Sequence, residues 1–377
     1  MITNLYRAIR LAGSWFQLAV LFIVILTGCK EGRPSDQTEP SRMHYARGFS
    51  FNTTGDITEL ELVVHGAHRS FLLIPVGLNV PDSTGKTIIR VPVQRVIVSG
   101  TTQVPWLEAL GVQDRLIGFP DPELIHSPMT ARRVQAGQVR DIGGAAGMDS
   151  EQVLSMKPDL VLAYPTTTGT REQLLSGYGI PVLSTSEMEE EHPLGRAEWI
   201  RLAGLLFGKR SEADSIFNAI ADRYQSLAGQ RKGKVPAPVV MTGIPYGGIW
   251  FIPGGKNSAA TLFRDAGFEY LWSDDGSTGI LQLGFEAVYA RALKADYWVG
   301  TGHLRDLDGM VGYEKRFRDF GPLRSGQLFT YSLDAAAAVP NAYFEEAVLR
   351  PDLLLQDLVL IREGAPEEQL RYYRKVR

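Results

Sequence analysis

Two carboxylates, Glu151 and Glu286, stand near the start of similar segments, "GMDSEQVLSMKPDLVLAY" and "LGFEAVYARALKADYWVG". Asp149 is a favourable N-cap, and Gln152 three residues later completes a pattern like the capping box, so Glu151 falls in the first turn of a helix. The helix dipole stabilises a negative charge there by about 0.3–1 kcal/mol. That effect alone explains one such glutamate without any partner.

Catalytic motifs are absent from the sequence. It contains no G-x-S-x-G nucleophile turn, no G-x-x-x-x-G-K-[ST] phosphate loop and no H-E-x-x-H helix. The stretch "GGKNS" has a glycine pair and a lysine, but its spacing predicts a turn or a helix start instead of a phosphate loop. We therefore predict that the protein is not an enzyme and has no cofactor of its own.

Cys29 is the only cysteine, and it follows a secretion signal. Arg7 and Arg10 precede an apolar run over 15–26, which is shorter than the roughly 20 residues of a membrane span. The ending "LTGC" resembles a bacterial lipobox, in which the cysteine receives a diacylglycerol and becomes the first mature residue. A plain signal peptide with an incidental cysteine is the alternative. We predict an extracytoplasmic protein that is lipid-anchored to the membrane, on the periplasmic face, and folds without disulfides.

Composition and charge describe an ordinary globular chain. Of its 377 residues, 44% are hydrophobic and 21% are charged, and the formal net charge is −3. This length suits two domains of common size. No long basic block occurs, so we predict no binding to nucleic acid.

Hydrophobic periodicity divides the chain into six segments. Residues 1–29 are the lipoprotein signal peptide, and the polar stretch 30–48 is a flexible tether. Short runs of β-branched and apolar residues predict a β-rich segment over 49–92. Strands then alternate with helices over 93–193, the N-lobe, and again over 231–377, the C-lobe. The stretch 194–230 keeps helical spacing, with Gly204 and Gly208 as possible interruptions, and predicts one long connecting helix or two nearly continuous ones.

The C-lobe repeats the order of the N-lobe. "LGFEAVYARALKADYWVG" parallels "MDSEQVLSMKPDLVLA", with Glu286 in the place of Glu151 and Asp296 in the place of Asp159. Alternating strands and helices imply parallel sheets covered by helices. The predicted fold is therefore α/β: two Rossmann-like lobes with parallel sheets, joined by one long helix, with a ligand cleft between them.

The stretches "PVQRVIV", "LEALGVQDRLIGF", "EQVLSMKPDLVLAY" and "GIPVLSTS" resemble the N-lobe of helical-backbone (class III) substrate-binding proteins of ABC importers. "GGKNSAATLFRDAGFEYLW" and "LGFEAVYARALKADYWVG" resemble the C-lobe of that family. The resemblance covers about 85–360, and the segment 43–84 lies outside it. It implies a monomer that delivers a ferric siderophore, haem or cobalamin to a permease dimer with its ATPase.

In that family one surface glutamate on each lobe forms salt bridges with arginines of the permease. The matching positions here are Glu151 and Glu286, so the resemblance implies permease docking for this pair. Because exposed ion pairs contribute only about 0–1 kcal/mol each, two such contacts would set orientation more than affinity.

A ligand in such a fold sits between the lobes, against the loops that follow the carboxyl ends of the strands. The residues that this rule selects are polar or aromatic, and the aromatic ones would stack on a flat ligand while the basic ones would meet carboxylates or phosphates. They are Thr101, Thr102, Trp106, Tyr164, Arg196, Tyr246, Trp250, His303 and Arg305. Half-buried packing is the alternative for each aromatic residue.

Direct metal binding would need three or four converging ligands. His126, His192 and His303 fall in the expected cleft loops, and the acidic run 187–191 is near one of them. Since the resemblance is to proteins that bind complexed metals, we predict no metal site and expect the acidic run to be a solvated loop or helix start. The alternative functions are surface ligand scavenging, partner binding or direct metal-ion binding by a lipoprotein with the same fold.

Overall fold

A four-stranded sheet opens the described part of the chain. The computed structural model describes residues 43–79, 85–143, 148–164, 170–230, 236–331 and 340–377, which lie in one compact unit, Pro40–Arg377. Strands β1 (Phe49–Thr54), β2 (Ile57–Val64) and β3 (Ala67–Pro75) are antiparallel, and β4 (Thr87–Val91) lies parallel to β3. Every second residue of β2 is buried, as expected for a sheet with one face on a core. This sheet is the structure of the segment expected to be β-rich.

The N-lobe is built on a five-stranded parallel sheet with the strand order β7-β6-β5-β8-β9. The central strands β5 and β8 are buried at every residue, because helices cover both faces of such a sheet. The strands are β5 (Val96–Val98), β6 (Leu116–Phe119), β7 (Arg140–Asp141), β8 (Leu160–Ala163) and β9 (Val182–Ser184). The helices are the 3-10 turns η1 (Thr101–Gln103), η2 (Gln113–Arg115), η3 (Pro122–Leu124) and η4 (Glu187–Glu189), with α2 (Val104–Ala109), α3 (Pro128–Gln135), α4 (Ser150–Met156) and α5 (Thr170–Gly177).

The C-lobe sheet has the order β13-β10-β15-β16-β17, parallel except for the last strand. A second, antiparallel sheet has the order β11-β12-β14. The strands are β10 (Val239–Met241), β11 (Ile244–Tyr246), β12 (Ile249–Pro253), β13 (Glu269–Tyr270), β14 (Ile280–Gly284), β15 (Tyr297–Val299), β16 (Leu328–Thr330) and β17 (Arg374–Lys375). The helices are α9 (Ser258–Asp265), α10 (Phe285–Ala292), α11 (Leu307–Tyr313), η5 (Lys315–Asp319), α12 (Gly321–Ser325), α13 (Ala342–Glu345), α14 (Pro351–Glu363) and η6 (Glu367–Gln369).

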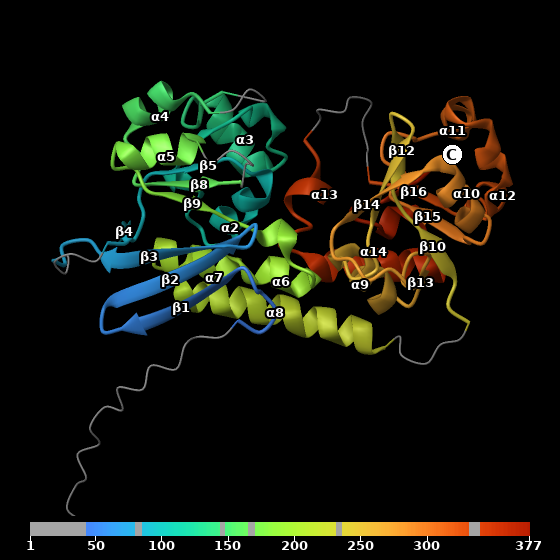
Figure 1. Cartoon of the computed structure of the whole chain (residues 1–377), viewed down its shortest axis with the longest axis horizontal. Helices are drawn as coiled ribbons and strands as arrows, with labels where there is room; N and C mark the ends of the chain where they lie inside the picture. The colour runs from blue at the N-terminus through green and yellow to red at the C-terminus, as the bar shows by residue number, and fades with distance from the viewer. Residues whose placement is uncertain (1–42, 80–84, 144–147, 165–169, 231–235, 332–339) are drawn as a thin grey trace, which may run out of the picture. The chain divides into compact units, whose positions relative to one another are not determined.

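The two lobes share a strand order, as the sequence repeat predicted. The order β6-β5-β8-β9 in the N-lobe matches β13-β10-β15-β16 in the C-lobe. Figure 1 shows β5, β8 and β9 in the first sheet and β10, β15 and β16 in the second. The two repeat-related aspartates also make the same kind of hydrogen bond. Asp159 accepts the backbone amides of Gln94 and Arg95, both at 2.9 Å, and Asp296 accepts that of Val239 at 2.8 Å. Each carboxylate thus fixes the start of the first strand of its lobe.

The connecting segment is not one continuous helix. It forms α6 (Pro193–Glu198), α7 (Ile200–Phe207) and α8 (Arg210–Gly229), and only α8, with 20 residues, is long. Gly208 ends α7 in the left-handed conformation, with φ +69°, which glycine adopts without strain. Helices α7 and α8 then pack against each other. A Cβ on Gly204 would lie 2.6 Å from the Cβ of Ala213, so glycine allows the close packing of α7 on α8. Both glycines that were possible interruptions of the helix, Gly204 and Gly208, thus contribute to the turn between α7 and α8.

Two buried carboxylates hold the chain that leads into β1. Glu198 accepts the backbone amides of His44, Tyr45 and Ala46 at 2.7–3.0 Å. Glu190 accepts those of Arg47 and Gly48 at 2.9 Å, together with the indole N–H of Trp199 at 2.9 Å. We call this arrangement the carboxylate clamp.

The acidic run begins a short helix, η4 (Glu187–Glu189), as one of the two expectations had it, but it is not solvated at two of its members. Glu187 is 0% and Glu190 is 4% exposed. Burial raises the pKa of Glu190, although its amide and indole donors act in the opposite direction. Buried carboxylates persist where donors satisfy their oxygens, and the backbone donors to Glu190 come from about 140 residues away in the chain.

Replacing Glu198 with alanine should lower the free energy of unfolding by about 2–4 kcal/mol, because one buried and two partly buried backbone amides lose their acceptor. Urea denaturation followed by circular dichroism measures this change. Glu191→Ala, an exposed position in the same acidic run, is the matched control and should cost less than about 0.5 kcal/mol. Similar losses in both variants would contradict a clamping role for Glu198.

Candidate functional site

The loops that follow the N-lobe strands line a cavity of about 320 Å³. Parallel strands end at the same edge of a sheet, and this cavity gathers loops after β5, β6 and β8. Its lining residues are Ser99, Gly100, Thr101, Thr102, Phe119, Pro120, Asp121, Leu124 and Tyr164. The structure thus brings together three of the residues selected from the sequence, namely Thr101, Thr102 and Tyr164.

Tyr164 is the exposed aromatic residue of this N-lobe cavity. Its side chain is 44% exposed, and its backbone amide donates to the hydroxyl of Ser99 at 2.7 Å. Partial burial raises the pKa of its phenol, and the charge of Glu187 acts in the same direction. Thr102, in contrast, is buried and donates its hydroxyl to Glu187 at 2.6 Å. The Tyr164 ring is therefore accessible from the cavity, whereas the Thr102 hydroxyl is already engaged.

An aromatic wall lines the C-lobe side. A cavity of about 360 Å³ is bordered by Tyr331, which directly follows β16, and by Tyr343 and Phe344 of α13. The rings of Tyr331 and Tyr343 stack with centroids 4.5 Å apart and an interplanar angle of 12°. Phe344 meets Tyr331 edge-on at 5.0 Å and remains 52% exposed. Burial raises the pKa of Tyr331 to about 12, so this wall is uncharged at physiological pH.

These three aromatic residues were missed at the level of sequence. Tyr331 satisfies the rule for cleft loops, because it comes immediately after a strand of the parallel sheet. Tyr343 and Phe344 lie on a four-residue helix away from any strand end, so the rule contains no signal for them.

Arg196 of α6 lies beside the aromatic wall. It lines an adjoining cavity of about 240 Å³ together with Met188, Tyr343 and Phe344. One terminal nitrogen of the guanidinium donates to the carbonyl of Met188 at 3.1 Å, and its Nε is buried without a hydrogen-bond partner among the described residues. Burial lowers the pKa of Arg196 from its ordinary high value, which leaves it a cation. It therefore contributes a positive charge to the lining of this cavity.

Trp106 and Trp250 are corrections to the predicted set. They are 1% and 0% exposed, so neither ring is accessible for stacking on a ligand. Trp106 lies on the inward face of α2. Trp250 occupies an inward position of β12 and packs on Trp298, with centroids 5.5 Å apart. Both belong to the hydrophobic core.

Three further predicted residues lie outside these cavities. Tyr246, on the β11–β12 hairpin, is 76% exposed. His303 is exposed and its ring centroid lies 6.1 Å from that of Tyr313. Arg305 is half-buried, with an Nε that has no partner in the described part of the chain. Their role in ligand binding stays a prediction.

The two repeat-related glutamates are both exposed at helix starts. Asp149 caps α4 as predicted, since its carboxylate accepts the amides of Glu151 and Gln152 at 3.0 and 3.2 Å. These donors lower the pKa of Asp149. Glu286 is the second residue of α10 and pairs with Arg316 at 2.7 Å while its side chain remains 79% exposed. Glu286 therefore presents its charge together with an arginine of its own chain.

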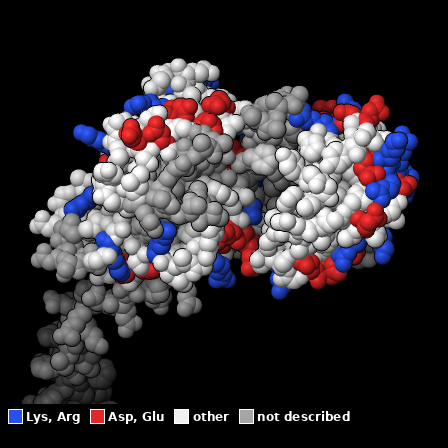
Figure 2. Space-filling view, turned by 45° about the horizontal axis from the view of Figure 1, so that its top comes forward, with Lys and Arg blue, Asp and Glu red and all other residues white. Residues whose placement is uncertain are grey.

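Surface charges are mixed in sign. On the face shown in Figure 2, the described Lys and Arg side chains are interspersed with Asp and Glu. The described residues contain no group of three or more His, Cys, Asp or Glu side chains arranged to hold a metal ion. None of the helices among them combines the length and the apolar content needed to cross a membrane. Cys29, the predicted lipidation site, lies outside the described residues.

Comparison with known proteins places these features in context. The model of a family described as "Periplasmic binding protein" matches residues 96–320. An uncharacterized lipoprotein of Methanocaldococcus jannaschii is 23% identical over 324 residues, which span 81% of this chain and 75% of the relative.

Solved structures show the same fold. A periplasmic heme binding protein of Pseudomonas aeruginosa superposes with a TM-score of 0.56 at 19% identity, over 73% of this chain and 94% of that one. The triscatecholate siderophore binding protein of Bacillus subtilis, solved with ferri-bacillibactin, gives a TM-score of 0.56 at 15% identity, over 74% and 95% of the two chains.

Proposed function

This chain belongs to the periplasmic binding protein family, and from that premise we propose that it is a lipid-anchored receptor that delivers a complexed metal to an ABC importer. The observation that carries the proposal is the aromatic wall of Tyr331, Tyr343 and Phe344 beside Arg196. Aromatic faces bind flat or ring-bearing ligands, and a guanidinium binds carboxylates or other anionic oxygens. Proteins of this fold with heme and ferric siderophore ligands support the same assignment.

The ligand we propose is a ferric siderophore, haem or a corrinoid. Each has a bulky organic frame with ring or conjugated surfaces, and most carry anionic oxygens that suit Arg196. Tyr164 on the N-lobe side supplies a further exposed ring. The receptor would act as a monomer and catalyse nothing itself, since the partner ATPase supplies the energy.

Delivery would use Glu151 and Glu286 as docking points for the permease. Both carboxylates are exposed on the first turn of a helix, and they occupy matching places in the two lobes. At the docking point of the C-lobe, Glu286 has a neighbour that the sequence did not suggest, Arg316. It bridges Glu286 and Glu314 at 2.7 and 3.0 Å, so a permease arginine would meet a carboxylate that is already paired.

Titration of the folded body with ferric siderophores, haem and cobalamin tests the ligand assignment. Binding to one class should quench tryptophan and tyrosine fluorescence with a saturable dependence on ligand concentration. Ferric and iron-free forms of one siderophore serve as a matched pair, because only a receptor for the complex should distinguish them. Absence of saturable binding to all three classes would refute the assignment.

A further inference from the structure

Asp121 has a backbone conformation that aspartate seldom adopts. It comes between β6 and Pro122, and its φ of 49° and ψ of 60° lie in the left-handed region. Residues other than glycine are strained there, and a following proline favours extended conformations instead. Two other described residues that are not glycine have a positive φ, but His65 lies in a two-residue hairpin turn and Lys157 ends α4. Asp121, in contrast, lines the N-lobe cavity.

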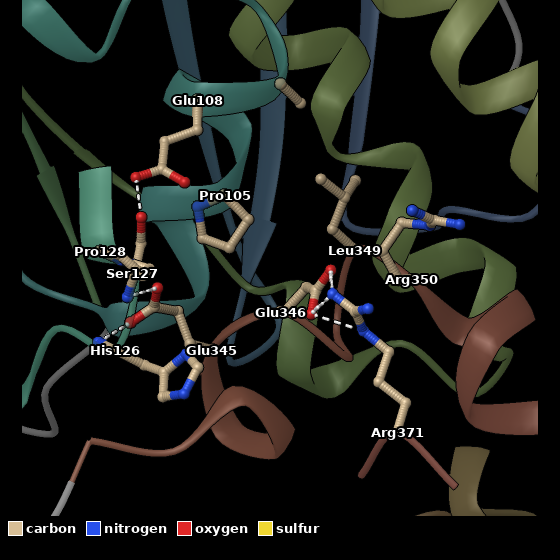
Figure 3. A pocket seen from close by; sticks show the side chains of 11 residues that line it. Pro105, Glu108, His126, Ser127, Pro128, Glu345, Glu346, Leu349, Arg350 and Arg371 are labelled. Carbon is tan, nitrogen blue, oxygen red and sulfur yellow. Dashed lines mark hydrogen bonds and ion pairs between the residues drawn. The ribbon is translucent and has the colours of Figure 1, made fainter. Parts of the chain in front are cut away.

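Contacts at both ends of the segment between β6 and α3 hold this conformation in place. The amide of Asp121 donates to the carbonyl of Gly143 at 3.1 Å. At the other end, the amides of His126 and Ser127 donate to the buried carboxylate of Glu345 at 2.6 and 2.9 Å (Figure 3). Strained backbone persists where the surrounding structure fixes it in this way, and it concentrates at functional sites.

The carboxylate of Asp121 is not used to hold the segment. It stands at the N-cap position of η3, where an aspartate side chain ordinarily accepts a backbone amide, but its oxygens accept none from this turn. Among the described residues it has neither a hydrogen bond nor an ion pair, and the described lining of its cavity contains no basic side chain. Its oxygens are therefore available to a group that enters the cavity.

The cavities on the two sides carry charges of opposite sign. Asp121 is the one charged residue in the described lining of the N-lobe cavity, and Arg196 is the one in the cavity beside the aromatic wall. Burial and the charge of Glu187 raise the pKa of the Tyr164 phenol, whereas the charge of Arg196 lowers it, so the guanidinium lies within electrostatic reach of the N-lobe cavity. A ligand that enters both cavities would meet a hydrogen-bond acceptor on one side and a cation on the other.

We propose that Asp121 is a specificity-determining residue that contacts the ligand and accepts hydrogen bonds from amide groups on it. This inference rests on the proposed function, and among those ligand classes it selects the corrinoid. A corrinoid carries primary amides around its ring together with an anionic phosphodiester, so it can satisfy Asp121 and Arg196 at once. Haem has no N–H donor at its periphery and a ferric tricatecholate is an anion, so neither gains from a carboxylate here.

Titration of the full chain with cyanocobalamin, haemin and a ferric tricatecholate tests the assignment. The wild type should bind cyanocobalamin most tightly. Asp121→Asn keeps the size of the side chain and tolerates the left-handed backbone, but it replaces a charged acceptor with a neutral one. Its affinity for cyanocobalamin should therefore fall about ten-fold, while its affinities for the other two probes stay unchanged or rise.

Glu123→Gln is the matched control for this loss of charge. Glu123 is an exposed carboxylate two residues away in the same η3 turn, and it does not line the cavity. Its replacement should leave the affinities for all three probes at the wild-type level.

Asp121→Gly supplies a readout that a purely structural aspartate would not show. Glycine adopts the left-handed conformation without strain, so this variant should melt at the wild-type temperature or above it. It should nevertheless lose at least about ten-fold in affinity for cyanocobalamin, because the acceptor is gone. A structural role predicts the opposite pair of results, a lower melting temperature with unchanged affinity.

Three results would overturn the inference while the proposed function stands. They are equal affinities of the wild type and Asp121→Asn for cyanocobalamin, tighter binding of haemin or the tricatecholate than of cyanocobalamin by the wild type, and a melting temperature of Asp121→Gly below that of the wild type. Failure of the wild type to bind any of the three probes would instead refute the proposed function, and this inference with it.

Discussion

Replacing Phe344 with alanine should weaken ligand binding by roughly ten- to a hundred-fold, because a ring that lines two adjoining cavities is lost. Burial of a phenylalanine side chain contributes about 1.5–3 kcal/mol, and each 1.4 kcal/mol is a factor of ten in the dissociation constant. Phe344 is 52% exposed in the free protein, so its removal should leave the melting temperature nearly unchanged. Fluorescence titration and thermal unfolding of the same variant measure both quantities.

Tyr178→Ala is the matched control for this prediction. Tyr178 is also an exposed aromatic residue, but it lies in the N-lobe between α5 and β9 and does not line the cavities beside the aromatic wall. Arg196→Gln should weaken binding to a similar degree for anionic ligands and much less for neutral ones. Equal affinities for wild type and Phe344→Ala would place the ligand elsewhere.

Charge reversal at both Glu151 and Glu286 should abolish uptake while ligand affinity stays intact. Each lysine would repel a permease arginine, and like charges at an interface cost far more than the original pairs contribute. Uptake of labelled ligand by cells that express the permease measures the first effect, and titration of the isolated receptor measures the second.

Asp114→Lys and Glu269→Lys are the controls for docking. Both are exposed acidic residues, one in each lobe, away from the first turns of α4 and α10. They change the net charge by the same amount and should leave uptake near the wild-type level. A loss of ligand affinity in the Glu151 and Glu286 variants would show that these residues are not docking points.

Much of the fold follows from local patterns in the sequence. Buried apolar runs such as β8 and the capped helix α4 were predicted because their determinants, periodicity and the Asp149 cap, lie within a few residues. The matching strand orders followed from the repeat, with Asp159 and Asp296 in corresponding places.

The candidate site was less predictable because its determinants are distant in the chain. Sequence places Trp106 and Trp250 near strand ends but does not say which way each ring points, and both point into the core. The burial of Glu190 within the acidic run has no local signal, because its backbone donors are the amides of Arg47 and Gly48, far away in the chain. Helix α13 inserts Tyr343 and Phe344 into the cleft through tertiary contacts alone.

The carboxylate clamp also determines the point from which the anchored protein would be held. Glu190 and Glu198 fix the chain from residue 44 onward to α6, in the connecting segment. With a lipid on Cys29, the intervening residues would extend at most about 50 Å, since an extended chain spans about 3.3–3.6 Å per residue. The tether would therefore keep the receptor within a shallow layer above the membrane, where it meets its permease. Because the tether is attached at the connecting segment, neither of the two lobes that carry Glu151 and Glu286 would be held by it.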